Sequence, residues 1–540
     1  MAGTIEPSIP GRGPVGTRAG GATIPRLTRR QTVLLVASLM AGIALAALDA
    51  LIVGTAMPTI VGSLGGLSLY AWLVAAYLLT STTTVPLYGR LADMFGRKPI
   101  FVAGIGVFIV GSALCGFATS MPQLILFRAL QGLGAGAVMP MAMTIIGDVF
   151  AVEQRARMQA LFGGVWGVSS IVGPLLGALI VSALSWHWVF FVNVPVGLVA
   201  MLLILIVYHE RVEHHSRRID YASGAFLIVG ATSLLLALQS TGRSDGLAGA
   251  PLVLLYVLSV VCIALFARRE SSSADPMVPL ALLRRPIIGV SYLVGLLSGL
   301  TQFGIGTYVP LFVQGPLGGT ALMVGLVIAP MSIGWPIGGV VSGRAILRLG
   351  YRRVLLAGML AIFLGSVGLM ALHRATPVPV LMGMVALVGL GMGLSSTPLL
   401  VAVQNAVEWN QRGVATALNQ FFRTIGGTLG VAVMGSVLNA GLGARLAGSP
   451  ALAGQSSAQV VLNQLLDPIG RLGLGADVQE ALRAALAETL RADFMVAAAA
   501  AALGLLAAII FFPAGSVAEH ASEGVSGTAP SVGGRSVGDR

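Results

Sequence analysis

The sequence predicts an all-α integral membrane protein with about fourteen transmembrane helices. Of its 540 residues, 56% are hydrophobic and only 10% are charged, whereas soluble domains carry about 25% charged residues. So few charges cannot cover a chain of this length with a water-facing surface. The 72 glycines follow no collagen-like period and lie within long apolar stretches, as glycines of packed transmembrane helices do. The composition is too apolar for a disordered chain, and two cysteines cannot form a disulfide framework.

Fourteen segments are long and apolar enough to cross a bilayer, which requires about 20 residues. The predicted spans are 32–60, 69–89, 99–119, 123–147, 158–184, 188–208, 221–240, 250–267, 286–313, 320–342, 354–372, 377–404, 413–439 and 494–513. We therefore expect disordered tails at 1–31 and 514–540, a six-helix bundle at 32–208, a two-helix insert with cytoplasmic loops at 209–285, and a second six-helix bundle at 286–513 that includes an outer loop at 440–493.

The basic residues follow the topology of a membrane protein. If residues 1–31 are cytoplasmic, 24 of the 32 basic residues lie on the cytoplasmic side, six on the outer side, and two, Arg128 and Arg423, inside predicted spans. Loops that stay in the cytoplasm retain positive charge. The bias predicts a multi-pass protein of the cell inner (plasma) membrane with both termini cytoplasmic. A nucleic-acid partner is not expected, because the charges are scattered rather than gathered on one face.

Two motifs repeat at nearly the same offset, which indicates two copies of one six-helix unit. They are residues 89–104 with 343–358, at an offset of 254, and Gly173, Leu176 and Gly177 with Gly426, Leu429 and Gly430, at an offset of 253. Repeated halves that flank a site at the membrane midplane are typical of secondary transporters.

The loop at 440–493 contains an amphipathic stretch. Val478, Leu482, Leu486 and Leu490 recur every four residues, with charged residues on the other faces. This period predicts a helix, which either lies on the outer membrane surface or covers the end of a transmembrane helix.

The stretch GRLADMFGRKP after the second span resembles the loop signature of the major facilitator superfamily. Its matching residues are Gly89, Leu91, Asp93, Gly96, Arg97 and Lys98. A tight glycine turn places Asp93 among basic side chains, where charge-assisted hydrogen bonds could hold one conformation closed. We expect a gating role, and the alternative is an ordinary positively charged cytoplasmic loop.

Two further spans resemble motifs of the same superfamily. Arg128 in the fourth span, with Gln131 one turn on, matches an arginine that is associated there with proton transfer; the alternative is a structural arginine bonded to carbonyl groups. An arginine facing lipid is expensive, so a partner inside the bundle is expected. Gly173, Pro174 and Gly177 in the fifth span match the motif that marks antiporters, and such a smooth face suits two bundles that rock against each other.

Asp49 is the candidate for proton coupling. It lies near the middle of the first span in ALDALIVGTAMPTI, and it is the acid that we place deep within a predicted span. Burial favours the neutral form of a carboxyl group and a nearby cation favours the charged form, so the group can exchange a proton between states; the alternative is a neutral structural aspartate. The segment resembles the first-helix motif of fourteen-helix drug:proton antiporters, with Leu51 and Gly54 where that family has Thr and Asn.

Residues 186–197 and 403–433 resemble further segments of that antiporter branch, and the resemblance covers most of residues 32–440. We expect the C-terminal bundle to contain no intramembrane acid. Its candidates for the substrate cavity, which join Asp49 and Gln131, are Gln302, Trp335, Asn419 and Arg423. Each of these side chains has packing as its alternative role. Aromatic groups in a pocket suit lipophilic cations or flat drugs.

The sequence contains no P-loop, no Cys/His cluster with metal spacing and no nucleophile elbow. We therefore expect no enzyme, nucleotide, metal or other cofactor, and a proton gradient as the energy source. The resemblance implies a monomeric multidrug or antibiotic exporter with a major facilitator fold, which works in the lipid bilayer by alternating access and exchanges small amphipathic compounds for protons. The alternatives are a proton-coupled exporter or symporter of a specific metabolite or lipid, and a receptor or scaffold that transports nothing.

Overall fold

The computed structural model describes residues 28–150, 152–208, 210, 221–240, 249–273, 276, 280–374, 376–407, 412–447 and 475–513. Within these residues the regular structure is helical throughout. Residues 1–27 and 514–540 of the predicted tails and residues 448–474 of the predicted outer loop lie outside the described residues. The predicted N-terminal tail is shorter than expected, because α1 begins at Arg29.

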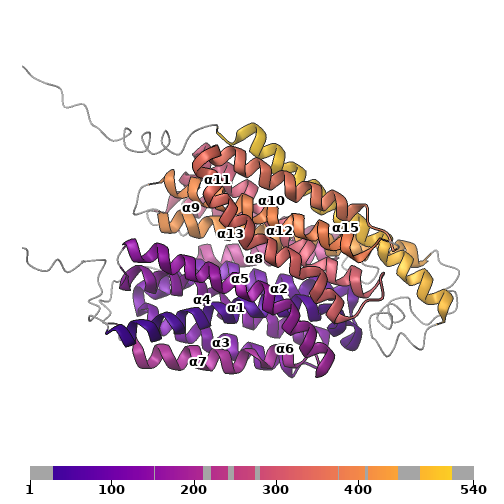
Figure 1. The fold of residues 1–540 in the computed structure, drawn as a ribbon, viewed down its shortest axis with the longest axis horizontal. Coiled ribbons are helices and arrows are strands. Elements are labelled where there is room, and N and C mark those ends of the chain that lie inside the picture. Colours follow the sequence, from indigo (N-terminus) through magenta and orange to yellow (C-terminus); the bar gives the residue numbers. More distant parts are fainter. Residues whose placement is uncertain are drawn as a thin grey trace, which may run out of the picture.

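Two groups of long helices pack into two bundles, with a helical pair between them in the chain. Figure 1 shows the N-terminal half (indigo to magenta) on one side and the C-terminal half (orange to yellow) on the other. The N-terminal bundle consists of α1 (Arg29–Leu64), α2 (Tyr70–Phe95), α3 (Arg97–Gly116), α4 (Met121–Val149), α5 (Val152–Ala183), and α6 (Trp188–Phe191) followed by α7 (Asn193–Val207). The inserted pair is α8 (Tyr221–Ser240) and α9 (Ala250–Ser272). The C-terminal bundle consists of α10 (Pro286–Gln314), α11 (Ala321–Met370), α12 (Val378–Asn405), α13 (Arg412–Ala447) and α15 (Ala476–Phe511). Short 3₁₀ helices occupy Leu67–Leu69 and Leu280–Arg284.

The helix count agrees with the prediction once α11 is divided. Eleven helices among the described residues are long and apolar enough to cross a membrane. At 1.5 Å per residue, the 50 residues of α11 would measure about 75 Å, far more than the roughly 30 Å of a bilayer core. Gly350 within it has non-helical angles, φ 77° and ψ 169°. Counting α11 as two helices, and adding α2 and α8, gives the predicted fourteen.

The internal repeat is visible in the backbone. Gly96 has φ 91° and Gly350, its counterpart in the repeat, has φ 77°, so both turns use a conformation that L-residues rarely adopt. Eight residues further on, Gly104 packs against α4 and Gly358 packs against α12 in the same way. The two copies thus share their turn and their closest helix contact. The second predicted span ends later than expected, because α2 continues past Gly89 to this turn.

Apolar side chains dominate both the core and the outer surface. On α9, Leu254 and Val260 are 65% and 67% exposed. Because large exposed apolar surfaces are rare in soluble monomers, a belt of this kind is consistent with contact to lipid.

The last helix is longer than predicted. Residues 476–511 form one continuous helix, whereas the sequence predicts a separate amphipathic helix followed by a span that starts at 494. Leu482, Leu486 and Leu490 of the predicted apolar stripe are fully buried in the core of the protein. This stripe therefore packs against the C-terminal bundle.

The two bundles meet tightly at one end. We name the end where α1 stops and α2 starts the distal end, and the opposite end, where α1 starts, the proximal end. Helix α5 packs on α11, α2 on α13 and α1 on α10. Three hydrogen bonds between the bundles lie near the distal end: Tyr70 Oη to the Thr307 carbonyl (2.7 Å), Thr59 Oγ1 to Gln314 Oε1 (3.2 Å) and Asn439 Nδ2 to the Ser68 carbonyl (3.1 Å). The structure is thus closed at its distal end.

Helix α8 lies over the contact between α2 and α13 and touches both of them. Leu235 of α8, which is 1% exposed, packs in one cluster with Leu79 of α2 and Ala432 of α13. The insert is therefore attached to both bundles rather than to one.

Candidate functional site

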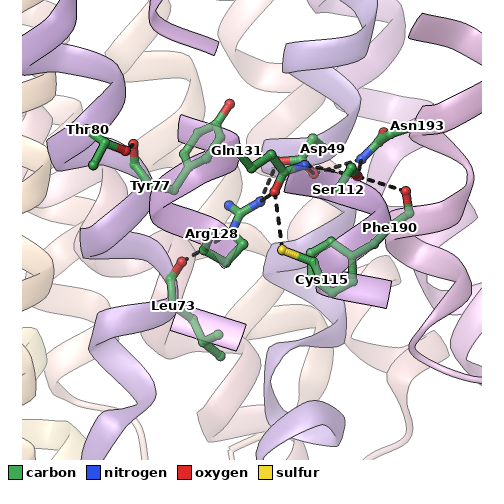
Figure 2. A network of polar contacts seen from close by, with 10 residues as sticks. All are labelled: Asp49, Leu73, Tyr77, Thr80, Ser112, Cys115, Arg128, Gln131, Phe190 and Asn193. Atoms are coloured by element: carbon green, nitrogen blue, oxygen red, sulfur yellow. Dashed lines mark hydrogen bonds and ion pairs between the residues drawn. The ribbon is translucent and has the colours of Figure 1, made fainter. Parts of the chain in front are cut away.

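The Asp49 carboxylate lies at the centre of a buried polar network in the N-terminal bundle (Figure 2). It is 0% exposed. Its Oδ2 accepts a hydrogen bond from Arg128 Nη1 at 2.7 Å, and its Oδ1 accepts from Gln131 Nε2 and Asn193 Nδ2, both at 2.8 Å. All three groups donate, which is the arrangement that an ionised carboxylate requires. Asp49 and Arg128 thus form a fully buried ion pair.

Arg128 is held from four directions. Besides Asp49, its Nη1 donates to Gln131 Oε1 at 2.6 Å and its Nε donates to the Leu73 carbonyl of α2 at 3.3 Å. The guanidinium carbon lies 4.2 Å from the centre of the Tyr77 ring. The cation is only 2% exposed and therefore faces the bundle interior, with Asp49 as its charged partner.

Ser112 bonds to two of the groups that donate to Asp49 and so holds them in place. Ser112 Oγ of α3 accepts from Gln131 Nε2 (3.1 Å) and Asn193 Nδ2 (3.0 Å), and it donates to the Phe190 carbonyl at 2.8 Å. The network therefore connects α1, α3, α4 and the α6–α7 segment. Sequence reasoning missed Ser112 and Asn193, although Asn193 lies within residues 186–197, which resemble the antiporter branch.

Glycines allow the helices that carry this network to approach closely. Gly111 of α3 lies against the backbone of Gln131, where an added Cβ would be 2.6 Å from the amide nitrogen. Gly132 of α4 lies against the Tyr77 backbone of α2 in the same manner. The polar side chains can meet because no Cβ keeps these helices apart.

The two charges of the network depend on each other. A buried ion pair is stable only while both charges are present, and removing one charge leaves the other uncompensated at a cost of about 3–5 kcal/mol. Protonation of Asp49 would remove the negative charge and leave Arg128 as a buried cation. The four helix segments that carry the network are thus joined through one ion pair.

The predicted cavity residues divide between the two bundles. Asp49 and Gln131 contact each other in the N-terminal bundle. In the C-terminal bundle the Arg423 guanidinium lies 5.0 Å from the centre of the Trp335 ring, and its Nη2 donates to Gln420 Oε1 at 3.0 Å. Within the described part of the chain, Arg423 Nε has no hydrogen-bond partner.

Gln302 and Asn419 lie on neighbouring helices of the same bundle. Gln302 of α10 is 8% exposed, and its Oε1 has no hydrogen-bond partner among the described residues. Asn419 of α13 lies close to Gly295 of α10. The described contacts do not join either side chain to the Asp49 network.

Glu210, which was not among the predicted site residues, holds the end of the predicted gating loop. Glu210 accepts hydrogen bonds from the backbone nitrogens of Arg97 (3.1 Å) and Lys98 (2.9 Å), the first residues of α3. A carboxylate at a helix N-terminus satisfies free N–H groups and is favoured by the helix dipole. Lys98 Nζ donates to the Leu205 carbonyl of α7. These contacts stay within the N-terminal bundle, and the side chain of Asp93 lies outside the described residues.

The glycine face of α5 packs against both bundles. Gly177 lies against Ile52 and Thr55 of α1, and Gly173 lies against Leu51. On the other side, Gly325 of α11 lies against the carbonyl of Pro174. The predicted smooth face therefore lies at the crossing between the bundles.

The C-terminal bundle, for which the sequence predicts no intramembrane acid, buries an acid that lies just outside the predicted span. Asp493 of α15 is 0% exposed, and neither carboxylate oxygen has a hydrogen-bond partner among the described residues. The predicted span began one residue after Asp493, because the charged residues before it resemble a loop. In the described residues, no group of three or more His, Cys, Asp or Glu side chains could hold a metal ion.

Comparisons with known proteins agree on one family. A model described as Major Facilitator Superfamily matches residues 39–431. Multidrug transporter protein MdtP of Bacillus subtilis is 41% identical over 407 residues, which cover 75% of this chain and 75% of that protein. Multidrug resistance protein 3 of the same organism is 36% identical over 406 residues, or 75% of this chain and 79% of that protein.

Two solved structures have a similar fold. A bacterial homolog of the human lysosomal transporter Spinster, in an inward-facing and occupied conformation, superposes with a TM-score of 0.62 at 14% identity and covers 90% of this chain and 98% of its own. A D-xylose-proton symporter gives a TM-score of 0.59 at 12% identity, with 89% and 98% covered. The predicted all-α membrane fold is confirmed.

Proposed function

The chain belongs to the Major Facilitator Superfamily and is a transporter rather than an enzyme, and from this premise we propose that it exports small amphipathic or lipophilic compounds in exchange for protons. The buried Asp49–Arg128 pair carries the proposal. Two relatives at 41% and 36% identity are named as a multidrug transporter and a multidrug resistance protein, which supports a substrate range of this kind.

Asp49 binds the transported proton. In the closed arrangement its carboxylate accepts from three donors, and charge-assisted hydrogen bonds of this type are roughly twice as strong as neutral ones. A proton that binds from the outer side removes the negative charge on which the strength of these bonds depends. Protonation leaves Arg128 with Gln131 Oε1, the Leu73 carbonyl and the Tyr77 ring but without a negative partner, and the helices that carry these groups shift.

The distal end corresponds to the outer side of the cell membrane in this proposal, and both termini are cytoplasmic. A protein that is closed at its distal end is then in the inward-facing state of an alternating-access cycle. The glycine face of α5, which packs on α1 and α11, allows the two bundles to rock. A monomer suffices for this cycle, and neither a nucleotide nor a metal takes part.

Arg423 and Trp335 contact the substrate from the C-terminal bundle. No carboxylate pairs with Arg423 in the described part of the chain, while an aromatic face lies 5.0 Å away. A guanidinium without a carboxylate partner disfavours a second cation beside it and stacks on planar groups. We expect flat compounds that are neutral or acidic to be exported better than permanent cations.

Purified protein in proteoliposomes tests the proposal. An imposed pH gradient should drive accumulation of a fluorescent amphipathic dye, and a proton uncoupler should abolish it. Asp49→Asn should remove gradient-driven accumulation while the dye still exchanges downhill. Equal gradient-driven accumulation by Asp49→Asn and the unaltered protein would exclude Asp49 as the coupling residue. Movement of protons and dye in the same direction would indicate a symporter.

A further inference from the structure

Asp493 is a buried acid that the proposed coupling at Asp49 does not use. Both groups are 0% exposed. Asp49 has three donors, whereas the two oxygens of Asp493 have no hydrogen-bond partner among the described residues. Two buried carboxyl groups in such different surroundings cannot both be ionised at low cost.

The surroundings of Asp493 are mostly apolar, and no described residue pairs with its charge. Leu490 and Ala497, one turn to either side, are fully buried in the core cluster. The ring of Phe494 packs on Phe312 of α10 with 6.1 Å between the centroids. An ionised carboxylate in such a place is penalised strongly unless it is paired, so the carboxyl group of Asp493 fits this conformation only with its proton bound.

The titratable groups near Asp493 form hydrogen bonds with other partners. Tyr308 of α10 lies within electrostatic range of Asp493, but its hydroxyl donates to the Val431 carbonyl at 2.9 Å. Arg445 of α13 donates to the Gly441 carbonyl. Arg491, two residues before Asp493 on α15, donates to the Met370 carbonyl at the end of α11. Helices α10, α11 and α13 are the elements on which α15 packs, and none of these groups bonds to Asp493.

Tyr308, which lies within electrostatic range of Asp493, is part of the distal contact between the bundles. The Tyr308 ring packs on the Tyr70 ring of α2, with 5.8 Å between centroids. Tyr70 in turn donates to the Thr307 carbonyl across the two bundles at 2.7 Å. Opening of the distal end must separate Tyr70 from Tyr308, which admits water to the layer of side chains beside Asp493.

We propose that Asp493 is a second proton-binding site, which must be protonated before the distal end can close. When the end opens, the O–H bond of the acid breaks, its proton passes to a water molecule, and a hydrated carboxylate remains. Closure requires the reverse transfer, in which hydronium gives its proton to the carboxylate and water remains. The site rests on alternating access, but it does not depend on Asp49 as the coupling residue.

Linkage determines the size of the effect. If only the protonated group is compatible with the closed form, the ratio of closed to open molecules falls about tenfold for each pH unit above the pKa of a hydrated carboxyl group. A protein without this carboxyl group should show no such dependence.

Distances between spin labels at the distal end measure this ratio. Labels are attached to cysteines at Thr119, between α3 and α4, and His373, between α11 and α12, both of which are exposed; the native Cys115 and Cys262 are buried. In the unaltered protein, the longer distance should gain population as the pH rises. Asp493→Asn, or Asp493→Leu if the first variant does not fold, should keep the short distance at every pH.

Two controls separate this site from other causes. Asp477→Asn removes an exposed acid from the first turn of the same helix and should behave as the unaltered protein does. Asp49→Asn should still open at high pH, so a failure of coupling at Asp49 is distinguishable from a failure at Asp493. The proposal is overturned if Asp493→Asn opens with pH as the unaltered protein does, or if the unaltered protein shows no opening.

Discussion

Replacing Asn193 by leucine removes one of the three donors to the Asp49 carboxylate at nearly constant side-chain volume. Asn193 Nδ2 lies 2.8 Å from Asp49 Oδ1 and 3.0 Å from Ser112 Oγ. The ion pair with Arg128 and the bond from Gln131 stay in place. The substitution therefore weakens the ionised state of Asp49 without removing its charge partner.

The structure sets the size and the sign of the effect. A hydrogen bond to a charged group contributes about 1.5–3 kcal/mol, and one pH unit corresponds to about 1.4 kcal/mol. Asn193 donates to the carboxylate, so its loss favours the protonated acid. The pH at which gradient-independent dye exchange is half-maximal should therefore rise by about one to two units.

The assay is dye exchange in proteoliposomes with equal pH on both sides, measured across a pH series. Ser38→Ala is the matched control, because Ser38 Oγ also joins α1 to α7, through a 2.8 Å bond to the Ala200 carbonyl, but does not touch Asp49. It should leave the pH midpoint unchanged. An unchanged midpoint in an active Asn193→Leu protein, or an equal shift in Ser38→Ala, would refute the reasoning.

Two further predictions concern stability. Gly177→Ala places a Cβ 2.9 Å from the Ile52 carbonyl oxygen and should cost about 1–3 kcal/mol through overpacking; thermal unfolding in detergent should show a lower midpoint than for Gly164→Ala, since an added Cβ at Gly164 meets nothing within 4 Å. Burial lowers the pKa of His187, whose ring stacks on Trp186 at 3.7 Å, so the folded state should lose stability as the pH falls below the ordinary histidine value of about 6.5. When the pH falls through that range, the unfolding temperature of His187→Gln should decrease less than that of the unaltered protein. An equal decrease would contradict the prediction.

The charges of the N-terminal bundle could be predicted from the sequence, while the neutral groups that hold them could not. Asp49 lies deep within an apolar span and Arg128 lies inside another, and the cost of an unpaired charge there demands a partner. Ser112 and Asn193 carry no such cost, because a neutral polar side chain can bond to its own helix. Their position in the network follows from helix packing, which glycines such as Gly111 determine.

Asp493 shows why span boundaries hide functional groups. Asp493 lies two residues after Arg491, and the two charges lower the hydropathy of any window that contains them. The predicted span therefore starts only after Asp493. In the structure the helix continues back to residue 476, and Asp493 is buried in the core while Arg491 reaches a carbonyl at the end of α11. The difference between the two side chains is one of orientation around the helix, and the long run of alanines after them provides no signal of it.

Helix α8 adds a mechanical constraint to the transport cycle. Leu235 packs at once on a helix of each bundle, Leu79 of α2 and Ala432 of α13. When those two helices separate, α8 cannot follow both, so one of its two interfaces must slide or part in every cycle. The inserted pair therefore has to change its contacts with at least one bundle during the cycle. Larger side chains in both interfaces of α8 would hold the two bundles together more strongly. They would slow turnover while leaving the binding residues untouched.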